Sequence, residues 1–491
     1  MSDNHAHPQN TRQVVGAAAA GLAATVIVIW LLHLHWLPLG IPGQWQWQVR
    51  QRPATPTIGL LLGAALVFFG GIAILDGCRR DSVRRAQAWA SAAALVLGSY
   101  LLAVGAVGSA EGGWLNATLA VCSDLSFGYF TEAVKHRSVA DFRRWLADTA
   151  ARTDPGQVPA RVATHPPGPV IFARWALGFL DRHTGLKRLL SFPLRLAVPS
   201  GRETARLAGL VSSAHPRSTE VAGAAGIVWF LALGAPAAVL GALAFGTALS
   251  GPRTGFITGA LSATIPALHV FMPGIDAWAA AFAIWSLALL TWAARTERPF
   301  IAAAAGVVWG IGLQWTFGLS ALLPIVAWLI WRHGRRRWLA LAALTVAGVV
   351  AAHIPLMLMG YEPLANFLAS MRAQRTIMAS RTYLGWLIFN FWDLVLFFGP
   401  ALVALCAAAG RDERDVLLPV GATVALLLLA GATRGEVGRI WSFLMPIAAA
   451  GAAGPLARLR ETPLVIAGAV VIAAQLAVMM AYSCYLALVT P

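Results

Sequence analysis

Residues 57–76 read TIGLLLGAALVFFGGIAILD, and their only charged residue is Asp76 at the last position. An α-helix needs about 20 apolar residues to cross the hydrocarbon core of a bilayer, and lipid leaves an isolated span no other backbone structure. Apolar runs of this kind recur from the beginning of the chain to its end. The sequence therefore predicts an all-α, polytopic membrane protein.

The overall composition agrees with this class. Of the 491 residues, 58% are hydrophobic and 12% are charged, whereas soluble globular proteins average about 25% charged residues. The net charge is +16, but the basic residues are scattered over loops and form no basic domain. They are typical of residues that orient a membrane protein and meet anionic headgroups. We therefore expect membrane lipids as partners and no nucleic acid.

The apolar runs divide the chain into three regions. An N-terminal membrane region, 1–110, holds three predicted spans, and a C-terminal membrane region, 221–491, holds about ten. Between them lies a large polar loop, 111–220. The predicted spans number about 13 and cover 13–33, 57–76, 86–108, 221–249, 255–271, 275–293, 299–315, 318–332, 338–357, 386–407, 414–431, 440–456 and 462–487.

Arginine is concentrated in the short loops on the N-terminal side of the membrane, among them Arg79, Arg80 and the run at 332–337. Positive charge in short loops resists translocation. This pattern predicts a cytoplasmic N-terminus and an extracytoplasmic 111–220 loop. The apolar run 166–180 is short and carries Arg174 at its middle, so we interpret it as an interfacial helix within that loop, not as a crossing.

The loop holds a first candidate motif, SDLSFGYFTE at 123–132. Asp124 is flanked by Leu125, Phe127 and Tyr129, and a partly desolvated carboxylate is suited to proton transfer. Glu132 follows eight residues later, which in a helix would place both acids on one face. The simpler interpretation is a hydrated loop acid.

The second motif is THPPGPV at 164–170. Pro166 and Pro167 fix an extended segment, and Pro169 is suited to the first turn of a helix. His165 is then held at the start of that helix, where it can donate to a phosphate or pair with a carboxylate. The alternative is a stiff loop that carries an incidental histidine.

Four further ionisable residues fall at the predicted outer ends of spans: Asp276, Asp393, Glu436 and Arg439. Ionisable groups at this depth are costly unless they pair or line a wet cavity, so they are functional candidates. Glu436 and Arg439 are three residues apart, which suits an ion pair on one helix face. A clamp between helices and a phosphate contact are equally consistent with that pair.

The two loop motifs, SDLSFGYFTEA and THPPGPV, together resemble the GT-C superfamily of membrane glycosyltransferases, which includes protein O-mannosyltransferases and aminoarabinose transferases. Two strings strengthen the resemblance: FMPGID at 271–276, at an outer turn, and RGEVGRIW at 434–441, at the mouth of a late span. The chain differs from the familiar members in two ways. Its acidic loop follows the third span instead of the first, and its motif holds one acid instead of an adjacent pair.

The resemblance implies a GT-C-like fold and an enzyme of the bacterial plasma membrane. Such an enzyme moves a sugar from a polyprenyl-phosphate donor to a glycan, lipid or protein acceptor on the extracytoplasmic side. Asp124 is then the expected general base, and Glu132 and His165 complete the catalytic set. The only cofactor that the resemblance allows for is a divalent cation, whose requirement stays open. The expected substrate-binding residues are Tyr129, Pro166, Pro167, Gly168, Asp276, Asp393, Glu436 and Arg439.

Other classes of function stay open. A transporter or flippase for a lipid-linked saccharide predicts charges near the bilayer midplane and two similar halves, which the sequence does not display. A catalytically inactive scaffold with the same fold would carry its polar residues in the same places. No P-loop, GxSxG or HExxH motif is present, so ATP-driven transport, serine hydrolysis and zinc proteolysis lack support.

Overall fold

The structure, a computed structural model, describes residues 8–79 and 85–488. Arg80, one of the basic residues expected on the cytoplasmic side, lies outside this part of the chain. Helices make up nearly all of the regular structure. The described residues contain one sheet, an antiparallel hairpin of β1 (Gly40–Ile41) and β2 (Trp45–Gln46). The predicted all-α class is confirmed.

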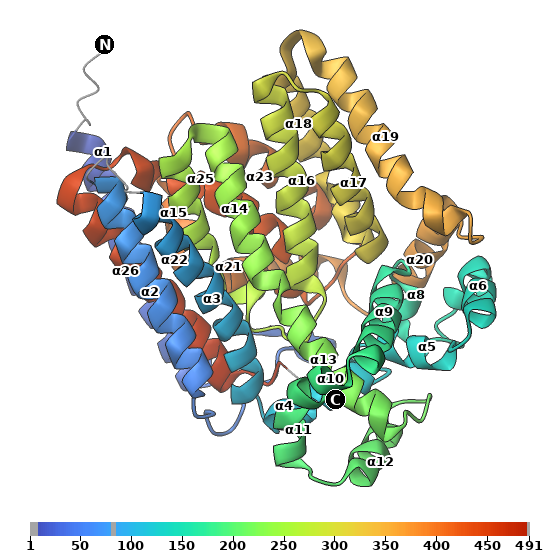
Figure 1. The fold of residues 1–491 in the computed structure, drawn as a ribbon. Helices are drawn as coiled ribbons and strands as arrows, with labels where there is room; N and C mark the ends of the chain where they lie inside the picture. The colour runs from blue at the N-terminus through green and yellow to red at the C-terminus, as the bar shows by residue number, and fades with distance from the viewer. Residues whose placement is uncertain (1–7, 80–84, 489–491) are drawn as a thin grey trace.

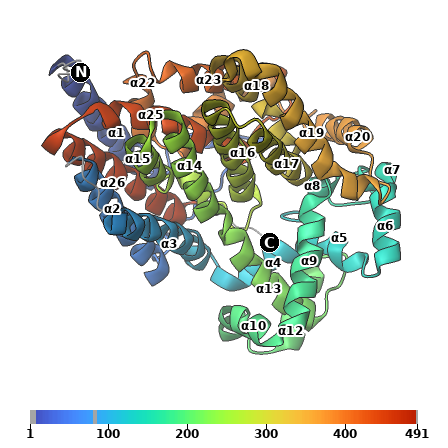
Figure 2. The same ribbon diagram turned by 45° about the horizontal axis from the view of Figure 1, so that its top comes forward.

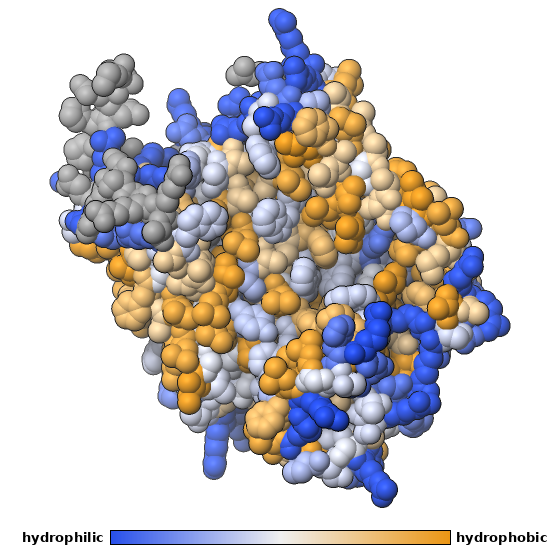
Figure 3. Space-filling model, viewed as in Figure 1, coloured by the Kyte–Doolittle hydropathy of each residue, from blue (hydrophilic) through white to orange (hydrophobic). Residues whose placement is uncertain are grey.

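Eight helical stretches of the described chain are long and apolar enough to cross a membrane. Many of them stand side by side in Figure 1, and Figure 3 shows hydrophobic surface around the middle of the molecule with hydrophilic residues gathered toward its ends. The protein is therefore of the multi-pass membrane type. The eight stretches are α1 (Pro8–His33), α2 (Ile58–Arg79), α3 (Arg85–Ser109), α13 with α14 (Ser218–Ala232 and Gly234–Ser250), α16 (Asp276–Thr296), η2 with α18 (Phe317–Leu322 and Leu323–Gly334), α19 (Trp338–Met357) and α26 (Glu461–Tyr485).

The predicted number of about 13 spans is not confirmed, because five of the apolar runs form shorter or broken helices. Two of these helices, α21 (Tyr383–Phe398) and α22 (Pro400–Ala407), meet at a bend of 100° and raise the count to nine if they form one span. The bend lies at Gly399, whose φ is 99°, directly before Pro400. The five runs correspond to α15 (Pro252–Ser262), α17 (Phe300–Trp315), α21 with α22 (Tyr383–Phe398 and Pro400–Ala407), α23 (Arg414–Ala430) and α25 (Met445–Arg458).

The polar loop folds into short helices that gather at the end of the bundle opposite the start of α1, as Figure 1 shows. The helix α20 (Pro363–Ile377) packs on this region through α7 (Thr149–Arg152). The helices of the loop are α4 (Gly113–Cys122), α5 (Tyr129–Lys135), α6 (Val139–Ala147), α7 (Thr149–Arg152), α8 (Ala160–Ala163), α9 (Gly168–Arg182), α10 (Thr184–Leu190), α11 (Phe192–Ala197) and α12 (Gly201–Val211).

The helix α9 matches the predicted start at the HPPG motif. It begins at Gly168, with Pro169 in its first turn, and is 15 residues long. It packs against α5 and α13 and lies beside them in both Figure 1 and Figure 2. Arg174, the charge at its middle, donates to the carbonyl of Arg137 at 2.8 Å. This helix is thus tied to the polar loop and is too short for a span, in agreement with the interfacial interpretation.

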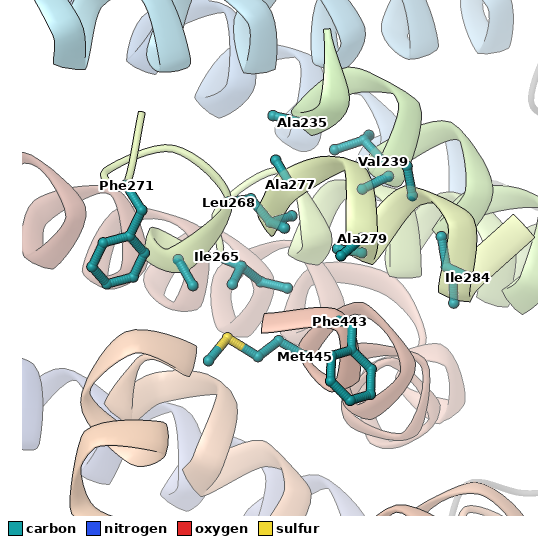
Figure 4. Packing of buried hydrophobic residues seen from close by; sticks show 14 of the residues in the cluster. Ala235, Val239, Ile265, Leu268, Phe271, Ala277, Ala279, Ile284, Phe443 and Met445 are labelled. Carbon is teal, nitrogen blue, oxygen red and sulfur yellow. The ribbon is translucent and has the colours of Figure 1, made fainter. Parts of the chain in front are cut away.

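A buried apolar core holds the segments that carry the candidate site. Figure 4 shows Ala235 of α14, Ala277 of α16, Phe271 of the connection before α16, and Phe443 packing into one cluster. Phe443 belongs to η4 (Ser442–Leu444), which follows α24 (Val437–Ile440), while η1 (Pro266–Leu268) and η3 (Arg335–Arg337) complete the helical elements. This packing places the start of α16 beside α24, although the two helices are far apart in the sequence.

Candidate functional site

Four charged side chains from three distant segments meet at the loop end of the bundle, and we call them the charged cluster: Arg161, Asp276, Glu436 and Arg439. Arg439 Nε lies 3.6 Å from Asp276 Oδ2. Arg439 also pairs with Glu436, and Arg161 Nη2 lies 3.9 Å from the same Glu436 oxygen, Oε2. The loop, the start of α16 and the segment at α24 therefore contribute to one site.

The position of Glu436 depends on an unusual backbone conformation. Its φ is 59°, in the left-handed region that residues other than glycine rarely adopt, and such strain is frequent at functional sites. Side chains of α21 hold this segment in place. The Asn390 amide donates to the carbonyl of Thr433 at 2.8 Å and accepts from the backbone N–H of Gly435 at 2.9 Å.

Asp393, a predicted substrate-binding residue, completes this support. Its carboxylate accepts from the indole N–H of Trp47 at 2.7 Å and from the backbone N–H of Gly438 at 2.6 Å. Both oxygens are thus used inside the protein, and the side chain is buried. Asp393 therefore fixes the backbone that carries Glu436 and Arg439.

Charges around the cluster outweigh the effect of burial on the pKa of two of its members, Glu436 and Arg439. For Glu436, burial raises the pKa, but Arg439, Arg161 and Arg381 outweigh it and leave the pKa lowered. For Arg439, burial lowers the pKa, but the charges of Glu436 and Asp276 outweigh burial and leave the pKa above its ordinary value. The Nε of Arg439 is buried and has no hydrogen-bond acceptor among the described residues. Buried donors are nearly always satisfied, so this N–H is open to a water or a ligand.

His165 and Tyr129 border the cluster. Their rings meet edge to face at 5.8 Å, and Thr164 Oγ1 lies 3.1 Å from His165 Nδ1. Burial, helped by Arg161 and Arg439, lowers the pKa of His165 to about 3, so the imidazole is neutral at pH 7 and forms no ion pair with a carboxylate. Burial raises the pKa of Tyr129, on which the charges of Arg161, Asp276 and Arg439 also act, so its phenol stays protonated.

The HPPG segment brings α9 against α17. A Cβ on Gly168 would lie 2.1 Å from the carbonyl oxygen of Gln314, so only glycine fits. Pro166 and Pro167 are also buried. These three predicted substrate-binding residues therefore position His165 through packing.

A small cavity opens beside the two arginines. Its volume is about 60 Å³, far below the roughly 300–1,000 Å³ of small-molecule pockets. The Nε of Arg161 donates to the carbonyl of Leu125 at 3.3 Å, so the turn of the acidic motif forms one wall. The cavity is lined by Ala120, Ser126, Phe127, Arg161, Phe271, Met272, Pro273, Gly274, Arg439 and Leu488.

Asp124 belongs to the same turn but is not among the residues that line the cavity, and its carboxylate is engaged elsewhere. Thr131 Oγ1 donates to Asp124 Oδ1 at 2.6 Å, and the backbone N–H of Ser213 donates to Oδ2 at 3.0 Å. The backbone N–H of Asp124 also donates to Val211. Asp124 therefore ties the motif turn to the end of α12 and does not belong to the charged cluster.

Glu132 lies on a different element from Asp124. The helix α5 begins at Tyr129, so the two acids do not share a helix face as the spacing had suggested. Glu132 is 1% exposed and pairs with Lys135 at 3.0 Å and with His136 at 3.4 Å. These contacts are local to α5, and among the described residues they connect Glu132 to no member of the cluster.

Two arginines of the site belong to neither of the two loop motifs nor to the four candidates at the span ends. Arg161 is one of many basic residues in the loop, and its only signal is a position four residues before His165. Arg381 acts on Glu436 and stacks over Trp45 and Trp386, at 5.9 and 5.8 Å. Both side chains gain their roles from contacts with segments far away in sequence.

The described residues contain no group of three or more His, Cys, Asp or Glu side chains placed to hold a metal ion. In the charged cluster, Asp276 and Glu436 face arginines instead, so these residues do not fit a divalent cation. Comparison with protein-family models and with curated proteins finds no match for this chain.

Proposed function

We propose that this protein is a membrane-embedded glycosyltransferase that moves a sugar from a polyprenyl-phosphate donor to an acceptor hydroxyl. The observation that carries the proposal is the meeting of Arg161 and Arg439 at one cavity, with a buried Arg439 N–H that finds no acceptor among residues 8–79 and 85–488. Guanidinium groups bind phosphate oxygens through paired, charge-assisted hydrogen bonds. The resemblance of the two loop motifs to the GT-C superfamily supplies the sugar and the lipid carrier.

The proposed reaction is a substitution at the sugar C1. The acceptor oxygen forms a bond to C1 as the bond from C1 to the donor phosphate oxygen breaks, with inversion at C1. The electron pair leaves with the lipid phosphate, whose charge Arg161 and Arg439 stabilise. The neutral His165 is able to donate a hydrogen bond to the same phosphate without adding charge.

A carboxylate must accept the proton of the acceptor hydroxyl. Asp276 belongs to the cluster and faces Arg439, so the geometry favours it as the general base. Asp124, which the motif favours, already accepts two hydrogen bonds that hold the turn. We therefore assign Asp276 as the base and Asp124 as a positioning residue.

Donor binding requires a larger space than the cavity of about 60 Å³. Two of its walls lie outside the candidate spans: the turn that includes Ser126 and Phe127, and the C-terminal segment at Leu488. Movement of either wall would open the arginines to a sugar phosphate. The proposal places the N-terminus in the cytoplasm of a bacterium and the site on the extracytoplasmic side of its plasma membrane.

The experiment is a transfer assay with the purified protein in liposomes. A panel of radiolabelled polyprenyl-phosphate sugars is offered with membrane glycan, lipid and protein acceptors, and transfer and release of polyprenyl phosphate are measured. We expect one donor to be consumed by the wild type and by Arg375→Gln, an exposed arginine of α20. Arg161→Gln and Arg439→Gln should be inactive. A wild type that consumes no donor, or active arginine variants, would refute the proposal.

A further inference from the structure

A second cavity lies among helix ends at the other end of the bundle, the end where α1 begins in Figure 1. It has a volume of about 1,000 Å³ and opens between the ends of α16, α18, α19 and α23. Its basic lining consists of Arg295, Arg332, His333, Arg336 and Arg337, and its acidic lining consists of Glu297 and Asp415. Arginines that only orient a chain in the membrane need no cavity, so this arrangement calls for another explanation.

Cationic groups are in excess inside the cavity. Arg332 pairs with Asp415 at 2.9 Å, and Arg337 pairs with Glu297 at 3.5 Å. These two contacts use both carboxylates of the lining. The remaining positive charges therefore have no acidic side chain of the lining to neutralise them.

The unpaired groups are two arginines and a histidine. Arg295 donates to the carbonyl of Ala248 at 2.9 Å but meets no carboxylate. Arg336 has neither a hydrogen-bond nor an ion-pair partner within the described part of the chain, and the buried Nε2 of His333 also lacks one there. The cavity thus presents two guanidinium groups and a ring nitrogen to an anion.

An apolar groove of about 560 Å³ begins beside this cavity. It lies between α17, α18 and α19, and its walls include Ile330, Trp338 and Ala342. Neighbouring positions on the same helices, such as Leu341, line the basic cavity. Trp331 and Trp338 at this boundary are 69% and 50% exposed, which is typical of tryptophans at the headgroup level of a bilayer.

We propose that the basic cavity and the apolar groove together bind one anionic phospholipid. Its phosphoryl headgroup lies among Arg295, Arg336 and His333, and an acyl chain occupies the groove along α18 and α19. A soluble phosphate would use the cavity alone, whereas the adjoining groove gives a lipid chain apolar contact as well. The site lies at the opposite end from the charged cluster and is independent of the transfer reaction.

The test is native mass spectrometry of the protein purified in detergent, with added phosphatidylglycerol or phosphatidylcholine of identical chains. We expect one phosphatidylglycerol to bind at least about tenfold more tightly than phosphatidylcholine, a difference of about 1.4 kcal/mol. The double variant R295Q/R336Q should lose this preference. The matched control R411Q/R414Q removes two exposed arginines outside the cavity lining and should keep it.

Two further measurements separate a lipid from a soluble anion. Ala342→Trp fills the groove and should weaken the binding of phosphatidylglycerol, although Arg295 and Arg336 remain unchanged in this variant. Millimolar glycerol phosphate should not displace the bound lipid. Equal binding of both lipids to the wild type, retention by R295Q/R336Q, or displacement by glycerol phosphate would each overturn the proposal. Monodisperse elution and an unchanged melting temperature identify variants that remain folded.

Discussion

Arg439 Nε and Asp276 Oδ2 lie 3.6 Å apart and join the start of α16 to α24. The contact is an ion pair, but the distance exceeds that of a hydrogen bond. The buried Arg439 Nε–H therefore has no hydrogen-bond acceptor in the part of the chain that the structure describes. An ion pair that leaves a buried donor free suits a site that receives an anion, and this relationship underlies the predictions for the charged cluster.

Arg439→Lys should separate charge from geometry. Lysine keeps the positive charge beside Asp276 and Glu436 but loses the planar fork that binds two phosphate oxygens. We expect transfer to fall by about 10²-fold or more, while the melting temperature changes little. The measurement is the transfer rate together with thermal unfolding. A lysine variant with the wild-type rate would assign Arg439 a purely structural role.

Asp276→Asn should mainly lower the rate of transfer, whereas Asp124→Asn should mainly lower the stability of the protein. Loss of the base should lower the rate by about 10²–10⁴-fold, and we expect this for Asp276→Asn. Asp124→Asn weakens two hydrogen bonds that hold the motif turn, so it should reduce stability by about 1–3 kcal/mol and the rate only modestly. Rates and unfolding midpoints of both variants decide the assignment. The reverse order, with a stable but inactive Asp124→Asn, would make Asp124 the base.

Gly168→Ala should damage the protein through packing. The added methyl would lie 2.1 Å from the Gln314 carbonyl oxygen, so α9 must shift away from α17. We expect a loss of about 1–3 kcal/mol of stability and reduced activity through the displaced His165. Gly178→Ala on the same helix meets nothing within 4 Å and serves as the control. If both variants unfold at the same temperature, the close approach at Gly168 is not important.

The low pKa of His165 predicts a pH dependence of stability. The group titrates near pH 6.5 in the unfolded chain and near pH 3 in the folded protein, so the folded state binds fewer protons between these values. Its stabilising contribution is present above pH 6.5 and is lost as the pH falls toward 3. At pH 5 the loss should reach at most about 2 kcal/mol.

His165→Asn removes this titration and should flatten the corresponding part of the profile. Melting temperatures of the wild type and the variant, measured from pH 7.5 to pH 4.5, provide the check. Comparing the two proteins cancels the acid groups that titrate in both. Parallel profiles over this range would mean that His165 is not buried in its neutral form.

The sequence was most informative where local chemistry decides the structure. The start of α9 followed from Pro169 because proline fits the first turn of a helix. The apolar run at 386–407 was predicted as one span, but hydropathy does not indicate the turn at Gly399 and Pro400, which bends the run by 100°. The other four unconfirmed runs form helices of only 11 to 17 residues, so eight or nine spans are supported where about 13 were predicted.

The site was only partly predictable, because its geometry depends on long-range packing. Tyr129, His165, Asp276, Glu436 and Arg439 were recognised as candidates, and the structure brings them together. Arg161 was missed, since its position four residues before His165 does not by itself distinguish it from other loop arginines. Glu132 looked functional by spacing, but its partners Lys135 and His136 lie within or directly after the same short helix.

The most direct test of the central claim is binding of polyprenyl phosphate, the proposed leaving group, which requires no knowledge of the sugar. Its affinity is measured in detergent for the wild type, Arg161→Gln, Arg439→Gln and the control Arg375→Gln. The arginine pair predicts that each of the first two substitutions weakens binding by about tenfold or more, while Arg375→Gln leaves it unchanged. Equal affinity in all four proteins would contradict a phosphate site at Arg161 and Arg439.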